Sequence, residues 1–478
     1  MGNGPRRMGE CRDLGNGFFM HSLRRDWHHR PTHRRVWRLA APMIASNLTV
    51  PLVSLVDSIM AGHLPHAEQL GAVAVGSAVY ALPVWICGFL RMGTIGFAAQ
   101  ATGRSDGDTL RRVLVQALAM AITLAGVVLL LAWPLLPTVL NMMKPSAALD
   151  GFALAYLHVR LAGLPAALVS YALIGWYLGM QNAGMALRVT VVTNVVNIVL
   201  NLVFVLALKW QVSGIALASV IGEWSGALAG LGCVAGQLRR YPGQLQARVM
   251  RRWASWQPLL AVNRDIFIRS LALQGVFFAV TVLGTRIGGS TVAANALLLN
   301  GLLVVSFALD GLANAVEALT GHALGRGDRL ALHRALVVAG GWSLLGGVLF
   351  AILFGVFGHT FIDLQTDIVQ VRITAYPYLP YLAALPLVAV WSYLLDGLFV
   401  GASRAREMRN TMLLAGMTFA LLAAELRPWG NHGLWLAFLG FMLARAAAMA
   451  WTARGITRRD EWIATNTGPG NVEAAPNS

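Results

Sequence analysis

The sequence predicts an all-α polytopic membrane protein with about twelve transmembrane helices in two pseudo-symmetric six-helix bundles. The 478 residues are 57% hydrophobic and only 12% charged, whereas charged residues make up about a quarter of a typical soluble chain. Apolar runs reach about 20 residues many times, which is enough to span the ~30 Å hydrocarbon layer of a bilayer. A short motif also recurs at equivalent places in the two halves.

Taken in order, the chain begins with a basic tail over residues 1–35, which has no apolar h-region and so is no secretory signal peptide. We expect an N-terminal bundle over residues 36–238, a cytoplasmic amphipathic connector over 239–264, a C-terminal bundle over 265–455 and a tail over 456–478. The hydrophobic segments are predicted to begin near Val36, Leu70, Val113, Phe152, Arg188 and Val212, and then near Ile266, Val292, Ala335, Ile373, Thr411 and Leu434.

The distribution of arginine predicts the orientation in the membrane. Turns after even-numbered segments are rich in arginine, whereas turns after odd-numbered segments carry few basic residues and residues 63–71 carry none. Cytoplasmic loops are enriched in Lys and Arg, so we expect both termini in the cytoplasm. The formal charge of +16 is therefore attributed to topology and not to nucleic-acid binding.

The repeated motif supports two related halves. Ala101–Arg104 ends the second segment of the first half, and Ala323–Arg326 ends the second segment of the second half. Two halves of the same orientation imply a pseudo-two-fold axis along the membrane normal, with a ligand path between them.

Asp57 is the leading candidate for a functional residue. No lysine or arginine lies between Arg38 and Arg91 to neutralise it, and a carboxylate in hydrocarbon costs about 2.5–3.5 kcal/mol on insertion scales. It therefore faces a cavity or carries a proton; the alternative is that it reaches the membrane interface. Pro51, six residues earlier, cannot donate a backbone hydrogen bond to Asn47 and predicts a helix kink.

Three amides of the fifth segment share one helical face, because Asn194, Asn197 and Asn201 follow i, i+3, i+7 spacing. This face points either at a cavity or at another helix, where amides act as interhelical hydrogen bonds. If Asp57 lies opposite, the amides could hold it in both its protonated and its ionised state.

Other charged residues within segments are secondary candidates. Asp310 and Glu317 lie two turns apart on one face of the eighth segment, with Arg91 as a candidate partner from the other half. Glu317 is near the predicted cytoplasmic end, where water could solvate it. Asp310 ranks second as a cation site and Asp396, in the tenth segment, ranks third.

The remaining polar residues are given structural roles or none. Glu223 is expected to be a structural partner in the sixth segment, and Asp265 and Arg269 are expected to form a local i, i+4 ion pair. No metal site is expected, because the three cysteines have no metal or redox spacing. The histidines lie at loops or segment ends, which disfavours a membrane-embedded enzyme.

Several motifs resemble those of multidrug and toxic compound extrusion (MATE) transporters. Leu55–Leu64 is similar to their first helix. Motifs similar to those of the DinF-type branch of the family are Arg91–Thr94, Ala99–Ala101, Asn263–Ile266, Arg269–Ser270, Ala308–Gly311 and Ala315–Ala318. The resemblance covers nearly all of residues 36–454 and implies a MATE fold, with two six-helix bundles that face a central cavity and work by alternating access.

The resemblance also assigns site residues. Asp57 matches the acidic, cation-coupling residue of the first helix, and Asn197 with Asn201 matches an Asn-x-x-x-Asp pattern of archaeal members in which the second residue is an acid. The glutamate that the NorM branch carries in the seventh helix has no clear equivalent within residues 269–286. These departures favour coupling to protons over coupling to sodium.

The resemblance thus implies an antiporter, not an enzyme, that exports amphipathic, cationic drugs or toxic compounds in exchange for protons. We expect a monomer in the bacterial inner membrane, in contact with lipids, with H+ as coupling ion, Na+ less favoured and no cofactor. A sodium-coupled MATE exporter and a lipid-linked oligosaccharide flippase are the alternatives. The flippase would need several deep arginines, and apart from Arg91 these are scarce in the sequence.

Overall fold

The computed structural model describes residues 25–142 and 147–462. The expected tails therefore lie mostly outside the described residues, as does part of the turn near residue 145. Within the described part of the chain, ten helices are long and apolar enough to cross a membrane, and the pair α6 and α7, bent by 46°, forms an eleventh span. The polytopic all-helical prediction is confirmed.

The N-terminal half contains six spans, of which three are interrupted. The bend between α6 and α7 coincides with Pro165 in the first turn of α7, and a π-helical segment, η1, continues α8. The elements are α2 (Arg30–Gly62), α3 (Ala67–Ile86), α4 (Phe89–Gly103), α5 (Gly107–Met142), α6 (Ala147–Leu161), α7 (Leu164–Gly179), α8 (Ala183–Asn201), η1 (Leu202–Ala207) and α9 (Gln211–Leu238). Helices α3 and α4 together make one span.

The C-terminal half repeats this arrangement. Helix α16 packs between α11 and α17 in the place of a sixth span, although it is less apolar than the ten helices counted above. The elements are α11 (Gln257–Ile287), α12 (Gly289–Gly325), α13 (Arg329–Asp363), α14 (Val369–Ala375), η3 (Tyr376–Tyr378), α15 (Leu379–Gly401), α16 (Ala405–Glu425), η4 (Arg427–Trp429) and α17 (Gly430–Arg458).

Two helices begin earlier than the sequence predicted. Between the halves lie only α10 (Ala247–Met250) and η2 (Trp253–Ser255), and α11 starts at Gln257, so residues 257–264 belong to a helix and not to the connector. Pro258 in its first turn favours helix initiation there. Helix α2 likewise starts at Arg30, inside the expected tail, and continues without interruption through Pro51.

The segment before α2 is packed against the C-terminal half. Asp26 is buried and pairs with Nε of Arg334 at 3.1 Å and with Nδ1 of His333 at 2.9 Å on α13. Burial alone would raise the pKa of Asp26, but the hydrogen bonds and charges of Arg334 and His333 hold it below its usual value. The ring of Trp27 occupies the space where a Cβ on Gly341 would lie.

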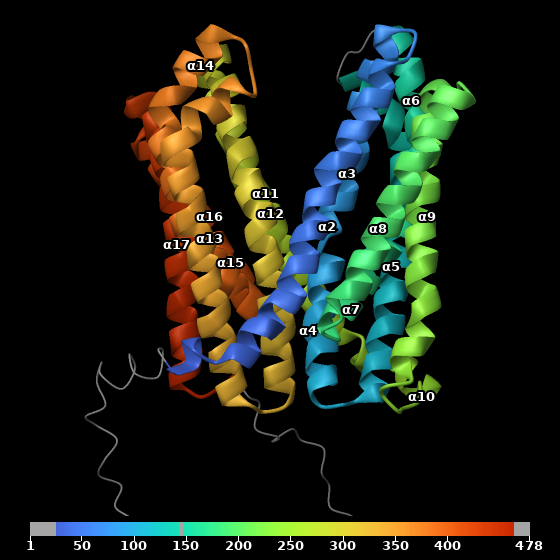
Figure 1. Ribbon diagram of the computed structural model, residues 1–478, viewed down its shortest axis with the longest axis vertical. Coiled ribbons are helices and arrows are strands. Elements are labelled where there is room, and N and C mark those ends of the chain that lie inside the picture. The colour runs from blue at the N-terminus through green and yellow to red at the C-terminus, as the bar shows by residue number, and fades with distance from the viewer. Residues whose placement is uncertain (1–24, 143–146, 463–478) are drawn as a thin grey trace, which may run out of the picture.

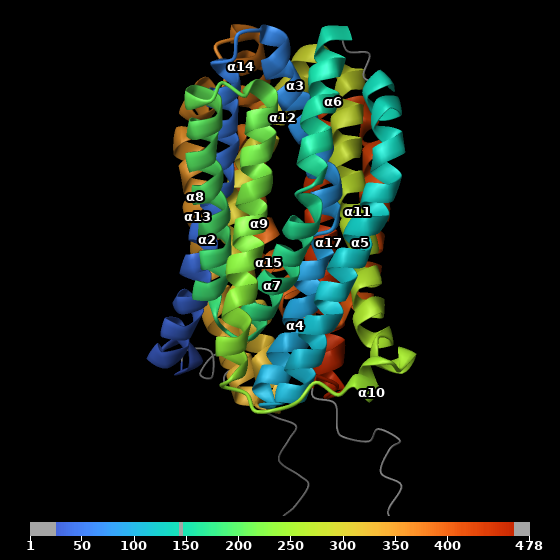
Figure 2. The same cartoon turned by 90° about the vertical axis from the view of Figure 1, so that its right-hand side faces the viewer.

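The two bundles meet at one end and diverge at the other. They separate toward the top of Figure 1, and the connector with α10 lies at the bottom. Near the bottom, α4 of the first bundle packs against α12 and α15 of the second. The side view of Figure 2 shows the spans running roughly parallel to this long axis.

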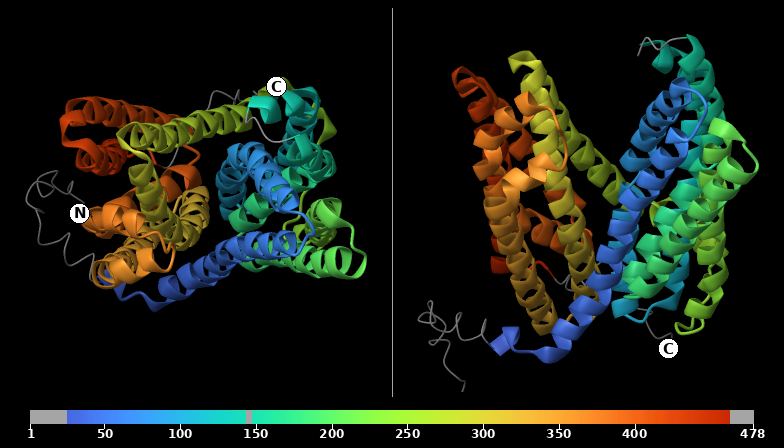
Figure 3. Two further views of the ribbon diagram at one scale, coloured as in Figure 1. Left: turned by 90° about the horizontal axis from the view of Figure 1, so that it is seen from above. Right: turned by 45° about the horizontal axis from the view of Figure 1, so that its top comes forward.

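Two helices belong to both bundles. Helix α2 packs against α12 and α13 as well as α8, and α11 packs against α4 as well as α16. Figure 3 shows α2 crossing from the C-terminal bundle at its start to the N-terminal bundle at its end. Helix α11 makes the opposite crossing, which is the arrangement that a pseudo-two-fold axis between the halves produces.

Candidate functional site

Asp57 lies near the end of α2, where its carboxylate joins a chain of amides. Oδ1 of Asp57 accepts a hydrogen bond of 2.7 Å from Nδ2 of Asn201, the last residue of α8. The same Nδ2 lies 3.1 Å from Oδ1 of Asn197, whose own amide donates to Oγ of Ser219 on α9 at 2.9 Å. Both asparagines are buried. The structure therefore brings Asp57, Asn197 and Asn201 together.

Asn194 occupies a separate position on the same helix. Its Nδ2 donates to Oγ1 of Thr49 on α2 at 2.6 Å and makes no hydrogen bond to Asp57. Asn194 and Asn201 therefore both face α2, while Asn197 turns toward α9. The helix geometry changes immediately after Asn201, where η1 takes the wider π-helical form, which is frequent at functional sites.

A largely buried ion pair lies in the same bundle, with side chains 14% and 13% exposed. Nη1 of Arg160 lies 2.9 Å from Oε2 of Glu223, and the hydroxyl of Tyr80 donates to the same oxygen at 3.0 Å. The guanidinium of Arg160 also lies 3.9 Å from the centre of the Tyr80 ring. Glu223 is thus fully partnered, whereas Asp57 has no ion pair among the described residues.

The charge balance of the N-terminal bundle follows from these contacts. Arg91 on α4 pairs with Asp310 of the other half, and Arg160 pairs with Glu223. The ionised carboxylate of Asp57 would therefore add a negative charge that has no ion-pair partner among the described residues. The sequence analysis overlooked Arg160. The available signal was an arginine within an apolar segment, in the last turn of α6, in the same half as a glutamate that also lies within an apolar segment.

Asp310 takes part in a contact between the bundles. Nη2 of Arg91 on α4 lies 3.4 Å from Oδ2 of Asp310 on α12, and Nη1 of Arg91 donates to Asn314 at 3.0 Å. Nδ2 of Asn47 on α2 lies 3.5 Å from the same carboxylate oxygen and donates to the Phe307 carbonyl at 3.0 Å. Arg91 and Asp310 are therefore partners across the two halves.

Asp396 is the acceptor of two buried arginines. Both Arg269 on α11 and Arg445 on α17 form ion pairs with its Oδ2. The prediction of an ion pair between Asp265 and Arg269 is wrong. Asp265 instead forms ion pairs with Arg264 at 3.1 Å and with Arg409 on α16 at 2.8 Å. Asp265 and Arg269, which are one helical turn apart, therefore each pair with a residue of a distant helix.

Glu317 is buried, whereas the sequence analysis suggested that water could solvate it. It is only 3% exposed, and its Oε2 has no hydrogen-bond partner among the described residues. The end of α12 is covered by α4 and α15, which removes the water that an exposed helix end would have. A buried carboxyl without donors is accommodated at lowest cost in its neutral form.

Deep arginines are more numerous than the sequence suggested. Arg160, Arg269 and Arg445 join Arg91 within the spans, and each is paired with a carboxylate. Two of the four share Asp396. Every deep arginine therefore has a carboxylate partner, and Glu317 is a further buried acid in the C-terminal bundle.

The closed end is formed by the repeated motifs themselves. A Cβ on Gly103 would lie 2.3 Å from the carbonyl oxygen of His322, and a Cβ on Gly325 would lie 2.2 Å from that of Gln100. Nε2 of Gln100 also donates to the Gly401 carbonyl at 2.9 Å. Only glycine allows the backbones of α4 and α12 to approach this closely, so the two copies of the motif seal this end reciprocally.

The comparisons with known proteins bear on this arrangement. The MatE family model matches residues 42–203 and 266–423, once in each half. The chain belongs to the MATE family. It is 41% identical over 434 residues to the DNA damage-inducible protein F of Escherichia coli, covering 90% of this chain and 94% of that protein. It is 27% identical to a probable multidrug resistance protein NorM of Rhizobium meliloti, covering 90% and 95% respectively.

Solved MATE structures share the fold. A MATE transporter in the bent conformation superposes with a TM-score of 0.83 at 19% identity, covering 93% of this chain and 99% of that one. An outward-facing multidrug resistance MATE transporter gives a TM-score of 0.80 at 18% identity, covering 90% and 97%. The MATE fold is thereby confirmed, as is the resemblance on which it was predicted. The relatives are transporters and not enzymes.

Proposed function

We propose that this MATE protein is a secondary antiporter that exports amphipathic, cationic compounds in exchange for protons, and that Asp57 carries the proton. The observation that supports Asp57 is that, within residues 25–142 and 147–462, it has no ion pair, whereas Arg91, Arg160 and Glu223 of the same bundle are each paired. A group that must gain and lose a charge in each cycle cannot be held permanently by a counter-charge.

The amide chain supports protons over sodium as the coupling ion. Asn201 donates to Asp57 at 2.7 Å where archaeal members have a second acid. A neutral amide can donate to an ionised carboxylate or accept from a protonated carboxyl after its side chain rotates. Asp57 can thus change protonation state without losing all its hydrogen bonds. A sodium-coupled exporter is the alternative.

The shape of the molecule supports alternating access. The bundles meet at the end that carries the arginine-rich turns and diverge at the end where α2 terminates. We propose that the meeting end is cytoplasmic, with both termini there, in a bacterial inner membrane. One charge that moves inward down about 100 mV then supplies about 2.3 kcal/mol per cycle.

A lipid-linked oligosaccharide flippase is the less favoured alternative. Its pyrophosphate would require free cationic groups in the spans. The four deep arginines are all paired with carboxylates, so they offer little free positive charge to such a substrate.

The test is the substitution Asp57→Asn in proteoliposomes that carry a pH gradient, with a fluorescent cation as cargo. Asparagine keeps the size and a hydrogen bond to Asn201 but releases no proton, so we expect normal membrane insertion and loss of gradient-driven efflux. Asp57→Glu keeps a titratable group and should retain part of the activity. Full gradient-driven efflux by Asp57→Asn would refute the assignment.

A further inference from the structure

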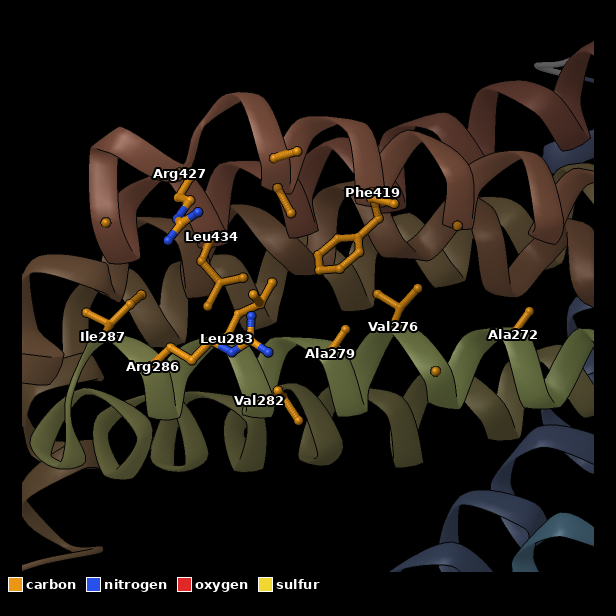
Figure 4. Close-up of a pocket in the computed structure, with 16 residues that line it drawn as sticks. Ala272, Val276, Ala279, Val282, Leu283, Arg286, Ile287, Phe419, Arg427 and Leu434 are labelled. Atoms are coloured by element: carbon orange, nitrogen blue, oxygen red, sulfur yellow. The ribbon is translucent and has the colours of Figure 1, made fainter.

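An apolar pocket of about 730 Å³ lies on the side of the C-terminal bundle, between α11, α16 and α17. Figure 4 shows α11 as one wall, with Ala272 near one end and Ile287 near the other. At 1.5 Å per residue, these fifteen steps along the helix span about 22 Å. That length exceeds the depth of about 15 Å of one hydrocarbon leaflet.

Small residues create this pocket and open it to the surface. Gly275, Ala420 and Ala424 line it and are exposed, so no large side chain closes the groove between α11 and α16. Its inner wall is formed by buried apolar side chains such as Val276 and Phe419. A long apolar ligand could therefore enter from the side.

Two arginines lie at one end of the pocket. Arg286 belongs to the last turn of α11 and Arg427 to the turn between α16 and α17. Figure 4 shows both guanidinium groups turned toward the pocket. Neither makes an ion pair or a side-chain hydrogen bond within residues 25–142 and 147–462, whereas Arg372 at the same end of the molecule is held by Asp367 at 2.9 Å.

The pseudo-symmetry sharpens the contrast with the Asp57 site. The family model matches once over α2 to α8 and again over α11 to α16, so α11, α16 and α17 are the counterparts of α2, α8 and α9. The N-terminal set encloses a carboxylate and amides, which suit a proton or a cation. The C-terminal set surrounds apolar walls and presents two exposed arginines at one end, which suit the opposite charge.

We propose that this pocket binds one phospholipid with an anionic headgroup, its acyl chain in the groove and its phosphate between Arg286 and Arg427. Arginine binds phosphate through two parallel hydrogen bonds, and both arginines lie where a bilayer places its phosphates, at the ends of spans. A cationic amphiphile would be repelled by the two charges. A neutral apolar molecule would gain nothing from the two arginines.

The test uses the purified full-length protein in detergent, titrated with phosphatidylglycerol and analysed by native mass spectrometry. Arg286→Gln combined with Arg427→Gln should weaken binding by at least about tenfold, because the phosphate loses its charged hydrogen bonds to both guanidinium groups. Ala420→Phe keeps both arginines but fills the groove, and should weaken binding as well. Lys209→Gln removes an exposed charge at the same end of the other bundle and should leave binding unchanged.

Several results would overturn the proposal. Unchanged binding in the double arginine variant would show that the headgroup lies elsewhere, and unchanged binding in Ala420→Phe would show that the groove is not used. Glycerol phosphate should fail to compete; competition equal to that of the whole lipid would leave only a surface phosphate site. Displacement of the lipid by a transported cation would identify the pocket as a cargo site instead. Equal melting temperatures of all variants exclude misfolding as the cause.

Discussion

Asn201→Asp would place a second carboxylate beside Asp57. The amide nitrogen of Asn201 lies 2.7 Å from the Asp57 carboxylate, and Asn201 is fully buried. The substitution is nearly isosteric and replaces a donor with an acceptor, so a hydrogen bond becomes a repulsion. Two charges about 4 Å apart at an effective dielectric constant of about 20 repel by about 4 kcal/mol.

That repulsion determines how the two carboxylates of the variant are ionised. A penalty of about 4 kcal/mol lowers the population of the doubly ionised pair roughly a thousandfold. The variant therefore binds either a proton or a cation between the two carboxylates. Oδ1 of Asn197 and Oγ of Ser219 lie along the same chain and supply further oxygens. We therefore expect transport by Asn201→Asp to become sensitive to sodium.

The assay is efflux of a fluorescent cation from proteoliposomes at a fixed pH gradient, with sodium or choline as the external cation. Asn194→Asp is the matched control, because it makes the same change two turns earlier, where the amide donates to Thr49 and not to Asp57. An active Asn201→Asp variant with the sodium response of the wild type would refute the reasoning. Equal sensitivity in Asn194→Asp would refute it too.

Three further predictions concern other parts of the molecule. Asp396→Asn should lower the free energy of unfolding by about 3–5 kcal/mol, because two buried arginines lose their carboxylate; an unchanged melting temperature would contradict this. Gly325→Ala should keep α4 and α12 apart at the closed end, because the added Cβ would lie 2.2 Å from the Gln100 carbonyl oxygen. Cysteine cross-linking between α4 and α12 should therefore fall in this variant. It should not fall in the control Gly126→Ala, where the added Cβ meets nothing within 4 Å. Because the pKa of Asp26 is lowered, its ionised form stabilises docking of residues 25–29 fully at pH values above the usual aspartate pKa of about 3.9. This stabilisation is lost as the pH falls through the lowered pKa. Limited proteolysis near Trp27 should therefore increase at low pH, and Asp26→Asn should abolish this dependence.

Local pattern predicted the parts of the fold that depend on the bilayer alone. The length of each apolar run predicted the spans, and the i, i+7 spacing placed Asn194 and Asn201 on the side of α8 that faces α2. The start of α11 was missed because Asn263 and Asp265 are polar. Both are nevertheless buried, since Asn263 lies against Gly93 of α4 and Asp265 pairs with Arg409 of α16.

Partner identity could not be predicted in the same way. Arg269 has an acid one turn away in the sequence but pairs with Asp396, 127 residues distant. The burial of Glu317 depends on α4 and α15, which come from different halves of the chain. The packing of the bundles determines which side chains become partners and which are buried, and a single sequence carries little information about that packing.

The crossing of α2 between the bundles constrains how the molecule can move. Its first residues follow the segment that Asp26 and Trp27 attach to α13, and its last turns carry Asp57 to α8. At 1.5 Å per residue, its 33 residues form a strut about 50 Å long. Any rocking of one bundle against the other must therefore be taken up within this strut, and Pro42 and Pro51 are the two points at which its backbone ladder is already incomplete and a hinge costs least.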